Sequence, residues 1–130
     1  MKKAYKQSIA FEITDENKPV NTPLENNHLF AKSGSQMVRI NFDEILYIKG
    51  EKEYVSLHFK DERLLVYKRM KDIESLLPSN FMRVHLSFII NTKHIVKVIG
   101  NKHVFIGAEK IPIGGTYRTR IKDYINRYTF

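Results

Sequence analysis

Residues 81–91 read FMRVHLSFIIN and hold the strongest β signal in this chain. Phe, Val and Ile favour strands, and the Pro-Ser-Asn run at residues 78–80 is typical of a turn. Arg83, His85 and Ser87 occupy alternate positions. Because successive side chains of a strand point to opposite faces, a single strand would present these three polar groups on one face. The other face would enter a core.

Short β runs separated by turn residues lie on both sides of this stretch. Residues 70–77 carry apolar side chains at helical spacing, and Pro78 ends that helix. Thr116 is a plausible N-cap for a last helix that reaches Tyr128. The chain is therefore predicted to be mostly β and antiparallel, with one short internal helix and a C-terminal helix. We expect the other strands at residues 28–33, 36–40, 45–49, 54–59, 64–67, 95–99 and 104–106, and residues 111–113 lead into the Gly-Gly pair at 114–115.

The N-terminal part of the chain has a different composition. Residues 12–27 contain few apolar side chains, and Pro19 and Pro23 lack amide donors, so this segment is predicted to be a linker. Residues 2–7 fit the last turn of a helix. We therefore predict residues 1–28 as a linker with a helical stub and residues 29–130 as the folded domain. Such a stub suggests an upstream domain in the natural protein.

The positive charge is confined to the predicted domain. The chain of 130 residues has a formal net charge of +8, and the four Lys and four acidic residues of residues 1–28 cancel. An excess of cations on one compact domain is typical of nucleic-acid binding. Charge alone does not distinguish DNA from RNA or an acidic membrane surface, and an ordinary soluble protein with a basic surface is the simplest alternative.

Several classes of protein are disfavoured by the composition. The chain has no cysteine, which excludes disulfides and thiolate metal sites. No apolar run approaches the roughly 20 residues of a membrane helix, and the start of the chain lacks the apolar segment of a secretory signal. We expect a cytoplasmic protein that does not bind membranes.

Catalytic and metal sites have little support in the sequence. A catalytic triad can be assembled on paper from among His85, Ser87, His94 and Asp72, but any chain with five His residues allows such a choice. The five His residues also lack the short helical spacing of zinc motifs. The Gly-Gly-Thr run at residues 114–116 has no following Lys, so it does not match a phosphate-binding P-loop. We expect neither an enzyme nor a metal or other cofactor.

Clusters of cations mark the predicted turns and helix starts. Cations are unfavourable at a helix N-terminus unless anions neutralise them, and phosphates would do so. Each cluster alone fits a solvated face, but their number favours a nucleic acid. The clusters comprise Lys49 and Lys52, then Lys68, Arg69 and Lys71, and finally Lys110, Arg118, Arg120 and Lys122.

Three stretches resemble the signature stretches of the LytTR DNA-binding domain. They are EILYIKGEKEYVSLHF at residues 44–59, FMRVHLSFIINTKHI at residues 81–95 and IPIGGTYRTRI at residues 111–121. The resemblance extends from about Leu29 to Tyr128. It implies an elongated fold of stacked antiparallel sheets and the output half of a bacterial two-component response regulator, with a phospho-receiver domain upstream. It also implies promoter DNA as the partner, bound through loops in successive grooves, usually by a homodimer on repeated half-sites.

The resemblance also indicates which residues face DNA. Bases would be read from the turn before Tyr54, from the segment after His85 and from the loop before the last helix. This chain departs from the usual basic or amide side chains there, because it has Glu53, Leu86 and Gly115. A protein-interaction module with weak, non-specific DNA binding is therefore the alternative function. The expected DNA-binding residues are Lys49, Lys52, Glu53, Lys68, Arg69, His85, Leu86, Ser87, Gly115, Thr116 and Arg118.

Overall fold

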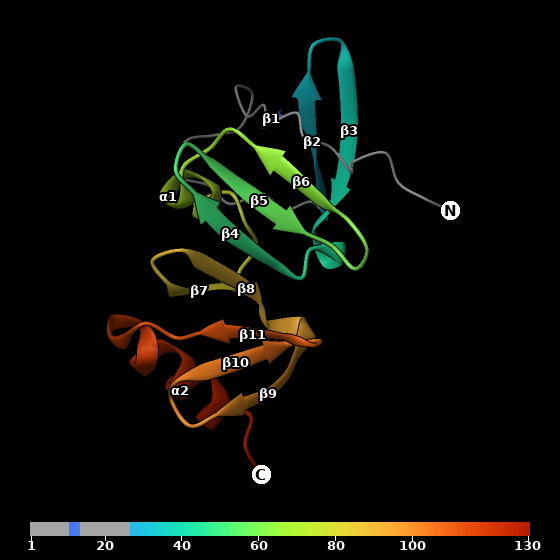
Figure 1. Cartoon of the computed structure of the whole chain (residues 1–130). Helices are drawn as coiled ribbons and strands as arrows, with labels where there is room; N and C mark the ends of the chain where they lie inside the picture. Colours follow the sequence, from blue (N-terminus) through green and yellow to red (C-terminus); the bar gives the residue numbers. More distant parts are fainter. Residues whose placement is uncertain (1–10, 14–26) are drawn as a thin grey trace.

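The computed structural model describes residues 11–13 and 27–130, which form three antiparallel sheets stacked into an elongated molecule (Figure 1). The mostly β, stacked architecture predicted from the sequence is confirmed. The first sheet has the order β1-β2-β3, with β1 Glu12–Ile13, β2 His28–Ser33 and β3 Gln36–Asn41. The middle sheet has the order β6-β5-β4-β8-β7, with β4 Tyr47–Glu51, β5 Tyr54–His58, β6 Arg63–Val66, β7 Phe81–His85 and β8 Phe88–Asn91. The third sheet has the order β11-β10-β9, with β9 Ile95–Ile99, β10 His103–Ile106 and β11 Glu109–Pro112.

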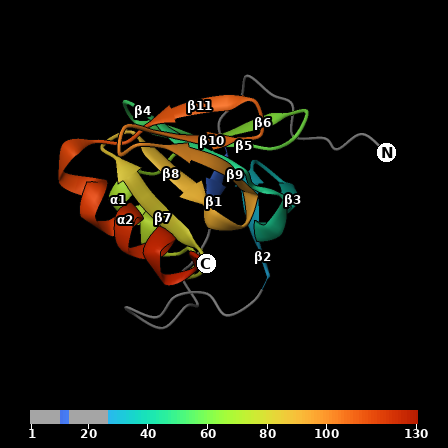
Figure 2. The ribbon, with the colours of Figure 1, turned by 90° about the horizontal axis from the view of Figure 1, so that it is seen from below.

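Helices α1 and α2 lie on the same side of the stack, one above the other (Figures 1 and 2). Helix α1 spans Met70–Glu74 and is shorter than the predicted 70–77. The predicted N-cap of the last helix is wrong. Thr116 lies inside a 3₁₀ turn, because the Tyr117 amide donates to the Gly114 carbonyl (2.9 Å) and Tyr117 becomes the cap. The remaining helical elements are η1 Phe42–Glu44, η2 Thr92–His94, η3 Gly115–Tyr117 and α2 Arg118–Arg127.

The stretch at residues 81–91 is a hairpin and not one strand. Strands β7 and β8 pair with each other, and the chain reverses at Leu86 and Ser87. The register shifts between Arg83 and His85. The prediction that Arg83, His85 and Ser87 share one strand face is therefore wrong, because the alternation of side chains stops where the strand turns.

The middle sheet separates two hydrophobic cores. Ile48 and Ile89 pack with the first sheet and α1, whereas their chain neighbours Tyr47 and Ile90 pack with the third sheet and α2. Because neighbouring side chains of a strand point to opposite faces, one sheet serves both cores. Both faces of the middle sheet are thus covered, and the turns between its strands lie at the edge of the stack (Figure 1).

Phe11 belongs to the first core although it lies within residues 1–28, the segment predicted as a linker with a helical stub. Its side chain is only 1% exposed. Its backbone bridges the edge of β6, because the Phe11 amide donates to Leu65 and the Tyr67 amide donates to Phe11 (2.6 Å each). Strand β1 follows it directly, at the start of the predicted linker. The helical stub predicted at residues 2–7 lies outside the described residues.

Candidate nucleic-acid interface

The first two predicted reading turns are joined by a backbone hydrogen bond. The Gly50 amide, next to the β4–β5 turn, donates to the carbonyl oxygen of Ser87 in the β7–β8 turn (2.8 Å). A Cβ atom at Gly50 would lie 2.8 Å from Cγ of Met70, so a larger residue here would have to displace the Met70 side chain at the start of α1. The backbone of Lys52, within the β4–β5 turn, adopts the left-handed conformation (φ 50°). These contacts bring the β4–β5 turn, the β7–β8 turn and the start of α1 together.

The third predicted turn abuts the second. The Gly114 amide donates to the Val84 carbonyl (2.8 Å), and a Cβ atom at Gly114 would lie 3.6 Å from Cα of His85. We call residues 50–53, 85–87 and 114–117 together the three-turn edge. Its members lie one below another on the left side of Figure 1. Three segments separated by about thirty residues each along the chain thus form one continuous surface.

The two acidic residues of the first turn differ: Glu51 contacts side chains of the protein, and Glu53 is exposed. The hydroxyl of Ser56, a buried residue, donates a hydrogen bond to Oε2 of Glu51 (3.0 Å). Nη1 of Arg63 lies 3.7 Å from the same oxygen. Glu51 is therefore engaged within the chain. Lys52 and Glu53 are exposed, so they are the side chains that this turn offers to a partner.

His58 completes this polar group beneath the turn. Its Nε2 lies 3.0 Å from the Ser56 hydroxyl, and its ring stacks on Tyr47 with centroids 4.3 Å apart. Burial, helped by the charge of Arg63, lowers the pKa of His58 to about 4. Burial also raises the pKa of Tyr47, and nearby Glu109 adds to that effect. A neutral His58 thus supports the strands from which the first turn projects.

The second turn presents a histidine of defined tautomer and an exposed leucine. The Ser87 amide donates to Nδ1 of His85 (3.0 Å), so a neutral His85 ring carries its proton on Nε2. Leu86 is 70% exposed. Nε2–H is a donor suited to a phosphate oxygen, and Leu86 is suited to an apolar group such as a thymine methyl.

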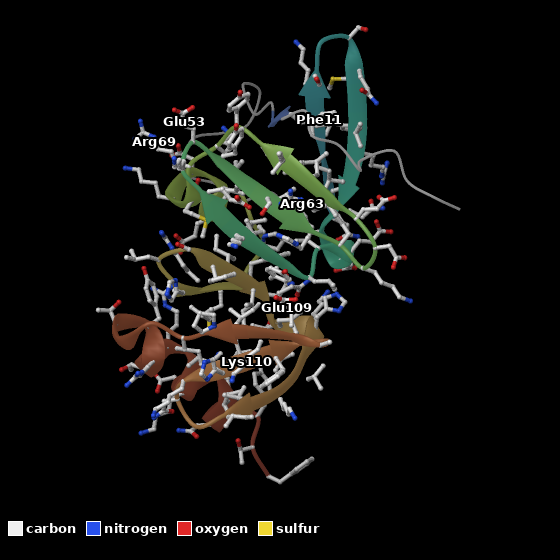
Figure 3. The ribbon with its side chains drawn as sticks, viewed as in Figure 1. Phe11, Glu53, Arg63, Arg69, Glu109 and Lys110 are labelled. Atoms are coloured by element: carbon white, nitrogen blue, oxygen red, sulfur yellow. The ribbon has the colours of Figure 1, made fainter. Side chains whose placement is uncertain are left out.

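Cations flank the three turns. Arg69 is exposed just before α1, and Figure 3 shows Arg69 and Glu53 projecting on the upper left of the molecule. Arg118 and Arg120 lie in the first turn of α2 and are exposed. Two cations in a first helical turn oppose the helix dipole, and nearby phosphates would relieve this repulsion.

Comparison with known families gives the same family as the sequence motifs. The model of the LytTr DNA-binding domain matches residues 35–126, a range that includes all three turns. The chain belongs to the LytTr DNA-binding domain family. Its three-turn edge is formed by residues within this LytTr domain.

Individual relatives agree with this assignment. The chain is 30% identical over 106 residues to sensory transduction protein LytT of Bacillus subtilis (strain 168), covering 76% of this chain and 44% of the relative. It is 28% identical over 129 residues to LytT of Bacillus anthracis, covering 94% of this chain and 52% of the relative. The chain thus spans about half the length of these curated relatives.

A solved structure shares the fold. It is described as the LytTr DNA-binding domain of a putative methyl-accepting/DNA response regulator from Bacillus cereus. The TM-score is 0.66 at 18% identity, with 77% of this chain and 97% of that chain covered. At this identity the likeness supports the fold of the LytTr domain.

The structure brings most of the predicted site residues to the three-turn edge. Lys49 lies within β4, opposite Ser56 on β5 and Phe88 on β8. Lys110, a member of one predicted cluster, lies on β11 opposite Phe105 of β10, and Figure 3 shows it away from the edge, over the middle of the picture. The predicted residues at or beside the edge are Lys52, Glu53, Lys68, Arg69, His85, Leu86, Ser87, Gly115, Thr116 and Arg118.

The sequence interpretation missed a cation beside the third turn. The Ile113 amide donates to the Lys102 carbonyl (2.8 Å), which places the exposed Lys102 next to Gly114. Lys102 lies in the β9–β10 turn, and its position within a Gly-Asn-Lys run was the available signal. We add Lys102 to the candidate phosphate contacts.

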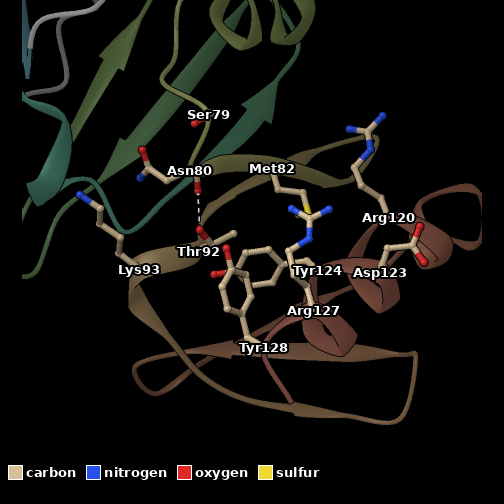
Figure 4. A pocket seen from close by; sticks show the side chains of 10 residues that line it. All are labelled: Ser79, Asn80, Met82, Thr92, Lys93, Arg120, Asp123, Tyr124, Arg127 and Tyr128. Atoms are coloured by element: carbon tan, nitrogen blue, oxygen red, sulfur yellow. Dashed lines mark hydrogen bonds between the residues drawn. The ribbon is translucent and has the colours of Figure 1, made fainter. Parts of the chain in front are cut away.

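A pocket of about 560 Å³ lies between α2 and the start of β7 (Figure 4). Within it, the Thr92 hydroxyl donates to the Asn80 carbonyl (2.8 Å). Two of its cations have carboxylate partners, since Lys93 lies 3.0 Å from Asp43 and Arg120 lies 3.8 Å from Glu74. We therefore do not propose a ligand for this pocket.

Across residues 11–13 and 27–130, no group of three His, Asp or Glu side chains is placed to hold a metal ion. In the same part of the chain, no helix is long and apolar enough to cross a membrane.

Proposed function

We propose that this LytTr domain is the sequence-specific output domain of a bacterial two-component regulator, which binds promoter DNA in the cytoplasm. The observation that carries the proposal is the contiguity of the three turns, joined by the Gly50–Ser87 and Gly114–Val84 hydrogen bonds. A continuous edge fits one side of a duplex, where its turns meet successive grooves.

In the proposed complex, phosphates are bound by groups that flank the turns. Nε2–H of His85, the hydroxyls of Ser87 and Thr116, and the guanidinium of Arg118 are suitable donors. Lys68 and Arg69 add positive charge at the first turn. Lys52, Glu53 and Leu86 face the bases, where a carboxylate accepts from cytosine N4 and an apolar side chain contacts a thymine methyl.

The wider assembly is part of the same proposal. We propose that two copies bind repeated half-sites and that a phospho-receiver domain precedes this domain in the full-length protein. The relatives named sensory transduction protein LytT are about twice as long as the aligned segment, which leaves room for such a domain.

The proposal is tested by selecting binding sites from a random duplex library and measuring affinity by fluorescence anisotropy. With about five phosphate contacts, the logarithm of affinity should fall against the logarithm of salt concentration with a slope near −4.5. The selected duplex should bind roughly a thousandfold more tightly than a scrambled duplex of the same composition, which is the lower end of the typical range for specific binding. Absence of binding to any duplex at low salt would overturn the proposal.

A second function is favoured by one observation. Leu86 is 70% exposed in the middle of the edge, where a basic or amide side chain is usual in the family. An exposed leucine fits an apolar patch on a protein partner. Equal, weak affinity for selected and scrambled duplexes would support this protein-interaction module.

A further inference from the structure

The guanidinium of Arg83 contacts other groups of the protein and is largely shielded from solvent. It donates from Nη2 to the Leu86 carbonyl (2.6 Å) and from Nε to the His85 carbonyl (3.4 Å). Its Nη1 lies 3.3 Å from Oε1 of Glu74, and its side chain is only 16% exposed. Arg83 therefore braces the β7–β8 turn from behind.

Glu74 connects this brace to both helices. It is the last residue of α1, and its second carboxylate oxygen lies 3.8 Å from Arg120 of α2. Helix α1 begins with Met70, whose side chain fills the space against Gly50 of the first turn. One carboxylate thus links the elements that carry all three turns.

We propose that Glu74 is a positioning residue for DNA binding, which acts through Arg83 and Arg120 to hold the three-turn edge in one geometry. The inference rests on the proposed function of that edge. Binding groups must be held within about half an ångström of their productive positions, and the second layer of hydrogen bonds does this. Loss of the Glu74 carboxylate would free Arg83 to leave the Leu86 carbonyl, so the second turn would move relative to the other two.

Charge alone and the positioning role predict opposite changes in DNA affinity when the Glu74 carboxylate is neutralised. Glu74→Gln raises the net charge by one, which by itself strengthens attraction to phosphates. The positioning role predicts the opposite. Glu74→Gln should weaken binding of the selected duplex about tenfold, which corresponds to a typical coupling between residues of one network. The salt slope should stay unchanged, because no phosphate contact is lost.

Asp43→Asn is the matched control. It also converts an acid to an amide, and it breaks the exposed ion pair between Asp43 and Lys93 (3.0 Å), which are 65% and 58% exposed. Its affinity should equal or slightly exceed that of the wild type. Glu74→Asp keeps the charge on a shorter side chain and should retain most of the affinity, which provides a second variant if Glu74→Gln unfolds.

Arg83→Met separates bracing from phosphate contact. If Arg83 acts through the turn, this variant weakens binding with an unchanged salt slope, and Arg83→Met/Glu74→Gln is no weaker than the weaker single variant. A slope flatter by about one unit would show that Arg83 contacts a phosphate and would overturn the inference.

A measurement without DNA distinguishes this inference from the proposed function. Hydrogen exchange of the Ser87 amide, which donates to His85, should accelerate in Glu74→Gln and not in Asp43→Asn. If the wild type binds no DNA, the proposed function fails and the exchange result still decides whether Glu74 holds the turn. Unchanged exchange, or binding by Glu74→Gln as tight as the wild type, would overturn the inference.

Discussion

The amide of Gly50 donates a 2.8 Å hydrogen bond to the carbonyl oxygen of Ser87, so two turns that are 37 positions apart in sequence share one backbone contact. A Cβ atom at Gly50 would meet Cγ of Met70 at 2.8 Å. The hydrogen bond joins the first turn to the second, and any side chain at position 50 would have to displace Met70 beside it.

Gly50→Ala should displace Met70 and loosen this contact. Overpacking of this kind typically costs about 1–3 kcal/mol in the free energy of unfolding, and the flexible Met side chain favours the lower end. Affinity for DNA should fall as the first turn shifts. Urea denaturation and anisotropy measure the two effects. For the stability measurement Gly115→Ala is the control, because a Cβ there has open space among the described residues; equal losses of stability in both variants would contradict the prediction.

Arg118→Ala should weaken binding to all duplexes alike. Arg118 is exposed at the start of α2, beside the third turn, where it is expected to contact a phosphate. Loss of one such contact flattens the salt slope by about one unit. Lys60→Ala is the control, since Lys60 lies in the β5–β6 turn, at the opposite end of β5 from the first turn. Selective loss at a single sequence would instead assign Arg118 to base readout.

The stability of the domain should fall as the pH falls from about 6.5 toward 4. The pKa of His58 is lowered to about 4 in the folded protein, by burial and by the neighbouring charge of Arg63, with Glu51 opposing. The unfolded chain therefore binds the proton first, so acid favours unfolding within this window. The loss due to His58 should be about 1–2 kcal/mol after allowance for its partial exposure. Urea denaturation at several pH values measures it.

His58→Gln is the variant that isolates this effect. It cannot titrate, so its stability should change less between pH 6.5 and 4 than that of the wild type. The comparison is of slopes, because the substitution also changes the stacking on Tyr47 and the absolute stability. Parallel pH profiles would show that His58 is not the titrating group.

Phe11→Ala should destabilise the domain by about 3 kcal/mol, as for other buried aromatic residues. Phe11 is 1% exposed and packs in the first core. Thermal or urea denaturation measures the change. Phe30→Ala is the matched control, because Phe30 is 40% exposed, and it should cost about 0.5 kcal/mol or less. Similar losses for the two variants would show that Phe11 contributes little to the core.

The burial of Phe11 in the first core could not be predicted from the sequence. Residues 12–27 are polar and contain Pro19 and Pro23, which favoured a linker. A single aromatic side chain before such a segment carries no periodic signal. Its partner is the edge of β6, and the pairing of a short segment with a distant strand edge is a tertiary contact.

By itself, the sequence determined the element types, the positions of the turns and the family, because alternation, turn residues and motifs are local properties of the chain. The tertiary structure alone decided what the polar side chains do. Arg83 lies on an alternating strand pattern, yet it turns inward because the hairpin reverses at Leu86 and because α1 presents Glu74. Periodicity assigns a side chain to a face, whereas its partner depends on which distant elements the fold brings to that face.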